Sequence, residues 1–169
     1  MYLLAALAAA ATLGDVTLPD TATVGEHAVV LNGMGLREKY FLDVYVLGLY
    51  LPEKSNDPSH ILDAEVPKQL VFTFLLPVDA ETLADNMRGR LNATEEAAPY
   101  TEQICGWMKD VDKGEQMSMD YAPGVGTTIT VGGAVQGTIE DVAVMTALFD
   151  LYVGEDPPSA SLKTGILGL

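Results

Sequence analysis

One stretch near the start of the chain, from Leu31 to Pro52, carries a single guanidinium inside a run of strand-forming residues. Valine, tyrosine, phenylalanine and leucine dominate this run, and these residue types favour β-structure. Charged side chains are rarely buried without a counter-ion or a full set of hydrogen bonds. Arg37 must therefore reach the surface or face a group such as a carboxylate, a carbonyl or an enolate.

The part of this run at 36–51 is too long for one ordinary strand. The alternation of apolar and polar residues fails after Tyr40, so we expect a bend or tight turn between Tyr40 and Asp43 that separates two antiparallel strands. An earlier strand is expected at 28–31. It is separated from the longer run by two glycines at which the chain can turn or bulge, Gly33 and Gly35.

Hydrophobic periodicity and capping residues predict the remaining elements. In chain order these are a short helix at 57–63, a strand at 69–76 buried on both faces or nearly so, a helix capped by Asp79, a helix at 99–111, a hairpin of 117–121 with 127–131 that continues into 134–137, a buried helix at 139–153 opened by Thr138 and Asp141, and a terminal helix capped by Ser159. Without βαβ alternation, this order indicates an α+β fold, a mainly antiparallel sheet covered by a layer of helices.

The composition favours one acidic domain. Of 169 residues, 49% are hydrophobic, which is enough for one well-buried core and short for two. The net charge of −15 repels nucleic-acid phosphates and anionic lipid headgroups, so we expect no nucleic-acid partner and no peripheral membrane binding. The acidic residues are spread along the chain, which indicates a solvated surface that serves solubility or salt adaptation. We expect a monomer.

Residues 1–14 are apolar and about as long as the central part of a secretory signal. We expect export to a periplasmic or extracellular location, with 1–14 as a signal-like leader and 15–169 as the domain. The segment lacks the usual basic start, so a truncated start, a weak signal and an ordinary amphipathic segment are alternatives. After removal of the leader, no segment is long and apolar enough to span a membrane.

The sequence predicts no metal site and no cofactor. Cys105 is the only cysteine, which excludes an internal disulfide and a cysteine-based zinc site, and we expect a buried structural thiol. His27 and His60 lie on different segments without the spacing of metal ligands. The glycine pairs at 33–35 and 124–126 lack the remaining glycines and the helix start of a nucleotide-binding loop.

Three blocks of the chain, at 32–52, 121–139 and 147–168, together carry a family resemblance. The first contains Asn-Gly-Met-Gly-Leu-Arg and Gly-Leu-Tyr-Leu-Pro, and the second begins Tyr-Ala-Pro-Gly-Val-Gly-Thr. The blocks resemble the secreted bacterial members of the chalcone isomerase-like superfamily. The resemblance implies an open-faced sandwich in which helices cover a large antiparallel sheet and a ligand cleft lies between the layers.

The resemblance also implies two site residues. An arginine after the Gly-x-Gly-x motif lines the cleft in the plant enzymes, and Arg37 matches it; fatty-acid-binding relatives hold a carboxylate with an arginine and a tyrosine, and Tyr45 is the candidate second group. A guanidinium can bind a carboxylate or enolate through two hydrogen bonds, and a phenol adds a third donor. The alternatives are an ion pair of Arg37 with Glu38 or Asp43 on the surface, and a core role for Tyr45.

The chain also departs from the plant enzymes. They carry a tyrosine and an asparagine on the helix after the long buried strand, whereas the segment 79–90 has no tyrosine and its Asn86 does not fall at the matching place. Arg37 is thus the one candidate catalytic residue, without the groups that position a flavonoid substrate.

These observations leave three functions open. The first is a protein that binds a small apolar, fatty-acid-like molecule with a carboxylate or carbonyl group through Arg37 and Tyr45. The second is an isomerase, an intramolecular lyase that closes a ring on a chalcone-type enone. The third is a non-catalytic module with a collapsed cleft that binds another protein.

Overall fold

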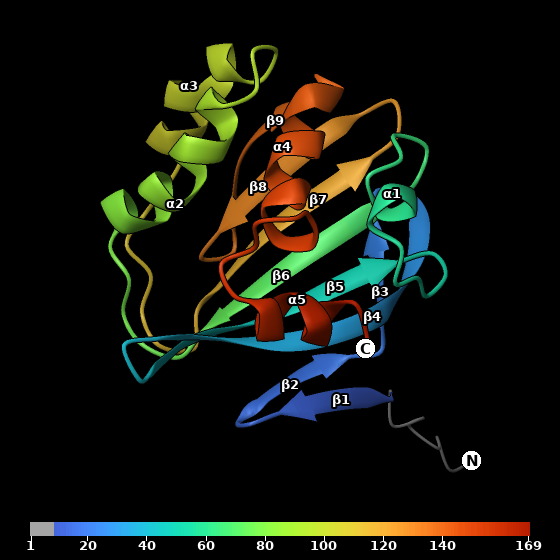
Figure 1. The fold of residues 1–169 in the computed structure, drawn as a ribbon, viewed down its shortest axis with the longest axis vertical. Helices are drawn as coiled ribbons and strands as arrows, with labels where there is room; N and C mark the ends of the chain where they lie inside the picture. Colours follow the sequence, from blue (N-terminus) through green and yellow to red (C-terminus); the bar gives the residue numbers. More distant parts are fainter. Residues whose placement is uncertain (1–8) are drawn as a thin grey trace, which may run out of the picture.

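The computed structural model describes residues 9–169, and their main feature is a curled antiparallel sheet with helices on its inner face (Figure 1). Each strand of this sheet pairs with the next in the chain. The seven strands are β3 (Thr21–Val24), β4 (His27–Lys39), β5 (Leu42–Leu51), β6 (Lys68–Phe74), β7 (Gln116–Ala122), β8 (Gly126–Val131) and β9 (Ala134–Ile139). The predicted α+β fold with a mainly antiparallel sheet is confirmed.

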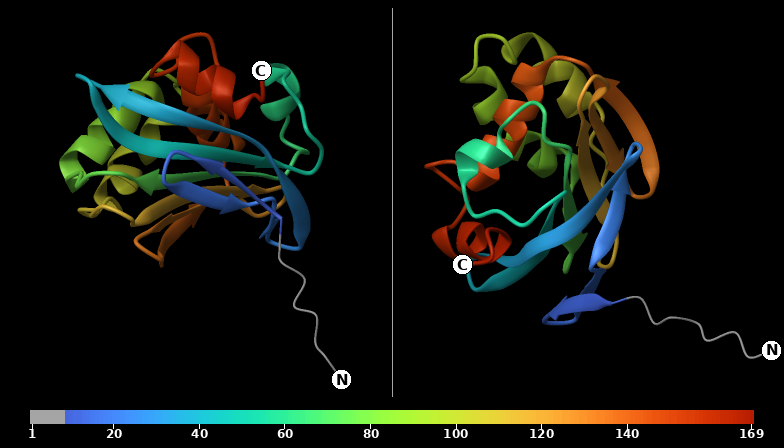
Figure 2. Two further views of the ribbon diagram at one scale, coloured as in Figure 1. Left: turned by 90° about the horizontal axis from the view of Figure 1, so that it is seen from below. Right: turned by 90° about the vertical axis from the view of Figure 1, so that its right-hand side faces the viewer.

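A separate two-stranded hairpin of β1 (Ala10–Leu13) and β2 (Val16–Pro19) lies against the outer face of the sheet (Figure 2). Leu18 packs over Gly48 of β5, where a Cβ would lie 2.5 Å from the leucine side chain. β1 falls within the segment 1–14 predicted as a leader, of which residues 1–8 lie outside the described part of the chain. The leader stays a prediction.

The helices begin at polar caps that the sequence indicates. Side-chain oxygens of Asp57, Asp79, Asp141 and Ser159 accept hydrogen bonds from backbone N–H groups in the first turns. The helical elements are α1 (Pro58–Ile61), α2 (Ala80–Asn92), the 3₁₀ turn η1 (Ala98–Tyr100), α3 (Thr101–Gly106), α4 (Val142–Val153) and α5 (Ala160–Ile166). Within the described residues, no helix combines the length and the apolar character needed to cross a membrane.

Two predicted helices are shorter than expected. The helix predicted at 99–111 ends at Gly106, because Val111 leaves it to form a β-bridge with Val78. The helix predicted at 139–153 begins only at Val142, because Thr138 pairs with β8 inside β9 and leaves Asp141 alone as the N-cap.

One prediction about the strands is also wrong in detail. Gly33 and Gly35 do not interrupt the sheet but lie inside β4, which continues from 27 to 39 with a bulge after Leu31. β6 is buried on its inner face and half-buried on its outer face, because the helices cover the inner face fully and the β1–β2 hairpin covers the outer face only in part. The predicted turn after Tyr40 is confirmed.

The larger core lies between the sheet and the helices. Alternate residues of β5, with Leu47 and Leu49 among them, point into this core, to which the apolar residues of α4 also belong. α4 is buried along most of its length, as its uniformly apolar sequence predicts, with Leu148 and Phe149 fully buried. Burial of these side chains fixes α4 across the inner face of the sheet (Figure 2).

The two glycines of β4 allow α5 to approach the strand closely. A Cβ at Gly33 would lie 2.3 Å from the carbonyl oxygen of Gly165, and one at Gly35 would lie 2.5 Å from the carbonyl oxygen of Leu162. Buried Asn32 donates to the carbonyl oxygen at the end of α5, that of Ile166, at 2.8 Å. The Asn-Gly-Met-Gly sequence of β4 therefore forms the surface on which α5 packs.

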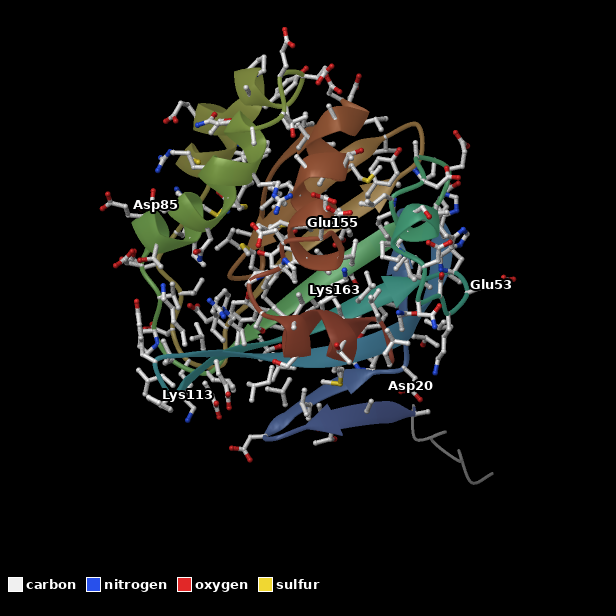
Figure 3. All side chains as sticks on the ribbon, in the orientation of Figure 1. Asp20, Glu53, Asp85, Lys113, Glu155 and Lys163 are labelled. Carbon is white, nitrogen blue, oxygen red and sulfur yellow. The ribbon has the colours of Figure 1, made fainter. Side chains whose placement is uncertain are left out.

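The acidic residues are distributed over the surface. Asp20, Glu53, Asp85 and Glu155 lie at well-separated places in Figure 3. This distribution fits a solvated acidic surface, as the spacing of these residues along the chain predicts.

Candidate functional site

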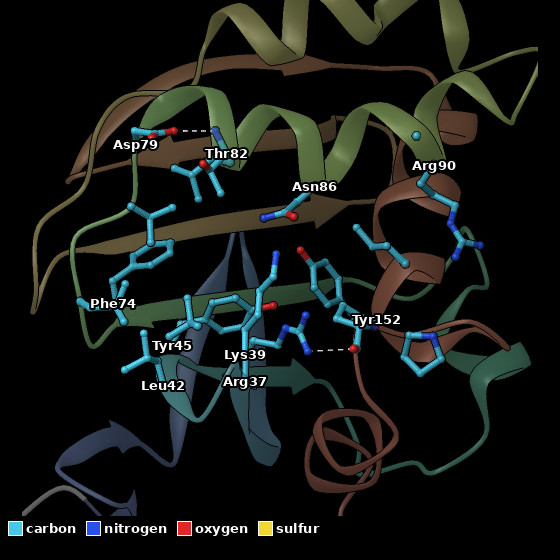
Figure 4. Close-up of a pocket in the computed structure, with 18 of the residues that line it drawn as sticks. Arg37, Lys39, Leu42, Tyr45, Phe74, Asp79, Thr82, Asn86, Arg90 and Tyr152 are labelled. Carbon is cyan, nitrogen blue, oxygen red and sulfur yellow. Dashed lines mark hydrogen bonds between the residues drawn. The ribbon is translucent and has the colours of Figure 1, made fainter.

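A cavity of about 790 Å³ lies between the sheet and the helices at one end of β4 and β5 (Figure 4). Its walls come from four places: the β4–β5 hairpin, the end of β6 with the loop after it, one face of α2, and the end of α4 with the loop at 156–158. Ligand pockets of proteins usually have volumes of roughly 300–1,000 Å³, so the cavity can hold a small molecule. The collapsed cleft expected of a pure interaction module is absent here.

Arg37 enters the cavity from β4 and is half-buried. Its Nη1 donates to the carbonyl oxygen of Pro158 at 2.9 Å (Figure 4) and to that of Glu38 at 3.1 Å. Among the described residues no carboxylate lies within ion-pair distance of it, so the expected alternative of a pair with Glu38 or Asp43 is not found. Two backbone carbonyls thus hold the guanidinium in place and leave its charge without a counter-ion.

Tyr45 faces Arg37 directly, because the two residues are register partners on adjacent antiparallel strands. The Tyr45 ring is buried and packs edge-on against Phe72 and Phe74, with ring centroids 5.2 and 6.0 Å apart. Burial raises the pKa of the Tyr45 phenol, and the positive charge of Arg37 opposes this rise only in part. The phenol therefore stays protonated at neutral pH and can donate a hydrogen bond.

A second phenol, that of Tyr152 from the last turn of α4, reaches the same place (Figure 4). Its ring packs edge-on against Phe72 at 5.3 Å between centroids. Burial raises the pKa of Tyr152 well above its usual value, with a further rise from Tyr45. Arg37, Tyr45 and Tyr152 together form the polar end of the cavity.

Apolar side chains line the cavity between this polar end and the tip of the β4–β5 hairpin. A bulge after Arg37 adds one residue to β5 there and turns Val44 towards the core. The apolar lining residues include Leu42, Val44, Phe74, Leu76, Pro77, Val78, Leu83 and Leu151. A molecule with one polar head and an apolar body fits this arrangement.

An ion pair lies at the edge of the cavity where α2 approaches α4. Arg90 of α2 donates from Nη1 to Asp150 of α4 at 2.5 Å and from Nη2 to the carbonyl oxygen of Asp156 at 3.1 Å. The charge of Arg90 is therefore compensated, in contrast to that of Arg37. The pair and the second hydrogen bond join α2 to α4 and to the loop that carries Pro158.

The structure brings the two predicted site residues together and adds others that sequence reasoning missed. Tyr152 lies in an apolar helix, where nothing in the sequence distinguishes a cavity residue from a core residue. Asn86, rejected by position, does line the cavity and points from α2 towards Tyr152 (Figure 4). Tyr152 and Asn86 can be identified as cavity residues only when it is known which turn of each helix faces the cavity. That information comes from the fold and not from the sequence of either helix.

The remaining chemical groups lie outside this site. Cys105 is a buried free thiol, as predicted. His27 at the start of β4 and His60 in α1 are both exposed and lie on separate elements. Residues 9–169 contain no cluster of three side chains of the kinds that hold a metal ion.

Comparison with known proteins gives a family match and a structural match. The sequence model of the family described as chalcone isomerase-like matches residues 10–168. The crystal structure of a fatty-acid binding protein from Arabidopsis thaliana superposes with a TM-score of 0.75 over 94% of this chain and 96% of that one, at 15% identity. At this identity the match shows a shared fold. Comparison with curated proteins gives no significant match.

Proposed function

Since this chain belongs to the chalcone isomerase-like family, we propose that its cavity binds a small apolar molecule with a carboxylate or carbonyl group, such as a fatty acid. The observation that carries the proposal is Arg37, a half-buried guanidinium in a mostly apolar cavity with no carboxylate partner among the described residues. A charge that is partly removed from water gains from a counter-ion, and an anionic ligand would supply one.

The three polar groups suit a carboxylate head. The uncommitted edge of the Arg37 guanidinium offers charged donors, and the phenols of Tyr45 and Tyr152 offer neutral ones from other directions. The apolar wall towards the hairpin tip would cover a hydrocarbon chain. The structural relative is by name a fatty-acid binding protein, which supports the same class of ligand.

The test is equilibrium binding of palmitate, measured by displacement of a fluorescent fatty acid, with wild type and Arg37→Met. Hydrogen bonds to a charged group contribute about 1.5–3 kcal/mol, so we expect palmitate to bind the variant about 10- to 150-fold more weakly. Methyl palmitate has no charge, so its affinity for the two proteins should be similar. Equal affinity of both proteins for palmitate would contradict the proposal.

Lys39→Met is the matched control. Lys39 also lines the cavity and carries one positive charge, but it is exposed and lies over the ring of Tyr40 at 5.5 Å. Its loss should change the affinity for palmitate less than twofold, because solvent screens its charge. A loss as large as that of Arg37→Met would mean that general attraction of anions, not a placed guanidinium, holds the ligand.

An isomerase is the second candidate, and the position of Asn86 in the cavity favours it. In such a reaction a phenoxide attacks an enone within one molecule, and negative charge develops on the carbonyl oxygen. Arg37 would stabilise that charge, with Tyr45 or Tyr152 as proton donor. Turnover of a chalcone that is lost in Arg37→Met would support this function; wild type that binds palmitate but converts no enone would exclude it.

The predictions about location rest on the sequence. We propose that the chain is an exported bacterial protein, periplasmic or secreted, and a monomer, on the basis of the apolar segment 1–14 and the resemblance of the motifs. Cell fractionation of the tagged protein with N-terminal sequencing tests export. Sedimentation equilibrium tests the monomeric state.

A further inference from the structure

The tip of the β4–β5 hairpin exposes three consecutive large apolar side chains. Tyr40 is 84% exposed, Phe41 104% and Leu42 59%. The other exposed large apolar residues of the described chain are not adjacent to one another: Val125, Val135, Val142 and Leu169. Single exposed apolar residues are ordinary on protein surfaces, whereas a cluster marks a contact with another apolar surface.

The backbone at the tip is unfavourable for the residues that occupy it. Tyr40 and Phe41 have φ angles of 51° and 64°, in the left-handed region where tight hairpins usually carry asparagine or glycine. Two aromatic residues at these positions cost stability and gain no core packing. The sequence of the tip is thus explained by neither the turn nor the core.

The tip also forms one edge of the cavity. Tyr40 and Leu42 line the cavity with one side, while Phe41 points away from it and is not among its lining residues. The apolar wall of the cavity begins at Leu42 and continues towards Tyr45. An apolar surface outside the protein that touched the tip would therefore be continuous with the inside of the cavity.

We propose that the hairpin tip inserts into the interface of a membrane of zwitterionic lipids and places this edge of the cavity where an apolar carboxylate leaves the bilayer. The biological role of this insertion rests on the proposed function, whereas the insertion itself can be tested without a ligand. Aromatic residues favour the headgroup region of membranes, and interfacial binding increases with the apolar area inserted.

Size and charge select this partner over others. A stable protein interface takes about 800 Å² from each partner, which is more than three side chains at a hairpin tip provide. Anionic lipids would be repelled by a net charge of −15, whereas zwitterionic lipids would not. The charge thus excludes binding by electrostatic attraction and leaves insertion of apolar side chains.

The experiment is flotation of the apo protein with phosphatidylcholine vesicles, comparing wild type with Phe41→Asn. Asparagine tolerates the left-handed backbone, so this variant should fold as well as wild type. We expect its partition coefficient to fall at least fivefold. Val125→Asn is the matched control, because Val125 is 55% exposed but lies in the β7–β8 turn at the other end of the sheet; it should float as wild type does.

A more sensitive reading uses tryptophan at the same two positions. Phosphatidylcholine with brominated chains should quench the added fluorescence of Phe41→Trp and leave that of Val125→Trp unchanged. Replacing a third of the lipid by phosphatidylglycerol should weaken wild-type binding. Stronger binding to the anionic vesicles, absence of quenching at position 41, or a dimer that Phe41→Asn abolishes would each overturn the proposal.

Palmitate binding in buffer separates this proposal from the proposed function. Phe41 does not line the cavity, so Phe41→Asn should bind palmitate in the absence of vesicles as wild type does. Failure of wild type to bind palmitate would refute the proposed ligand, while the vesicle experiments would still decide whether the tip enters a membrane.

Discussion

Substitution of Gly35 by alanine should destabilise the protein through one clash between β4 and α5. The new Cβ would lie 2.5 Å from the carbonyl oxygen of Leu162 and 3.0 Å from its Cδ1, and neither contact can be relieved by rotating the alanine. Overpacking of this kind costs about 1–3 kcal/mol, against which alanine recovers about 0.5 kcal/mol of backbone entropy. We expect a net loss of about 1–2 kcal/mol.

Thermal and urea denaturation measure this loss. For a chain of this length 1 kcal/mol corresponds to about 2–4 °C in Tm, so Gly35→Ala should melt about 2–8 °C below wild type. The same variant should bind palmitate more weakly, because movement of α5 displaces the carbonyl of Pro158 that holds Arg37 at 2.9 Å. A variant as stable as wild type would refute the close approach of α5 to β4.

Gly89→Ala is the control for the substitution itself. Gly89 lies inside α2, and a Cβ there would meet nothing within 4 Å. Alanine is more favourable than glycine in a helix interior by about 0.5–1 kcal/mol, so this variant should gain stability. The same chemical change is thus expected to have opposite signs at the two positions.

Two further predictions concern polar groups that lie away from the cavity. Burial lowers the pKa of Lys68 to about 8, whereas a lysine of the unfolded chain has a pKa of about 10.4. Between these values the unfolded state binds more protons, so the stability of wild type should rise relative to that of Lys68→Met from pH 8 to pH 10. A parallel pH dependence of the two unfolding free energies would contradict the lowered pKa. Asp141 accepts from the N–H of Ala143 at 2.9 Å, so Asp141→Ala should lose about 1 kcal/mol in urea denaturation and Asp141→Asn much less.

The sequence alone could predict the polar end of the site in part. The failure of alternation after Tyr40 locates the hairpin, and an antiparallel hairpin places Arg37 opposite a residue of the next strand. The bulge after Arg37 shifts the register by one residue, so pairing counted from the turn alone would give the wrong partner. The family resemblance supplied Tyr45 where periodicity could not.

The rest of the site depends on contacts between distant parts of the chain. Tyr152 is one of several apolar or aromatic residues of α4, and only the packing of that helix on β6 decides which of them reaches the cavity. The pair of Arg90 with Asp150 joins residues on separate helices. Local sequence patterns carry no information about such pairs, because they report periodicity within one element.

The residues of the motif that precede Arg37 all contribute to the position of its side chain. Gly33 and Gly35 leave room for α5, and Asn32 fixes the end of that helix. α5 in turn positions the loop at 156–158, whose last carbonyl accepts a hydrogen bond from Arg37.

The charged group therefore owes its position to residues that never touch a ligand. It follows that a ligand which pairs with Arg37 should also stabilise α5 on β4, because whatever binds only the folded arrangement shifts the equilibrium towards it. Palmitate should raise the Tm of wild type and should raise that of Gly35→Ala less, because the variant with the displaced guanidinium binds the ligand more weakly. Equal shifts in the two proteins would contradict the coupling of Arg37 to α5.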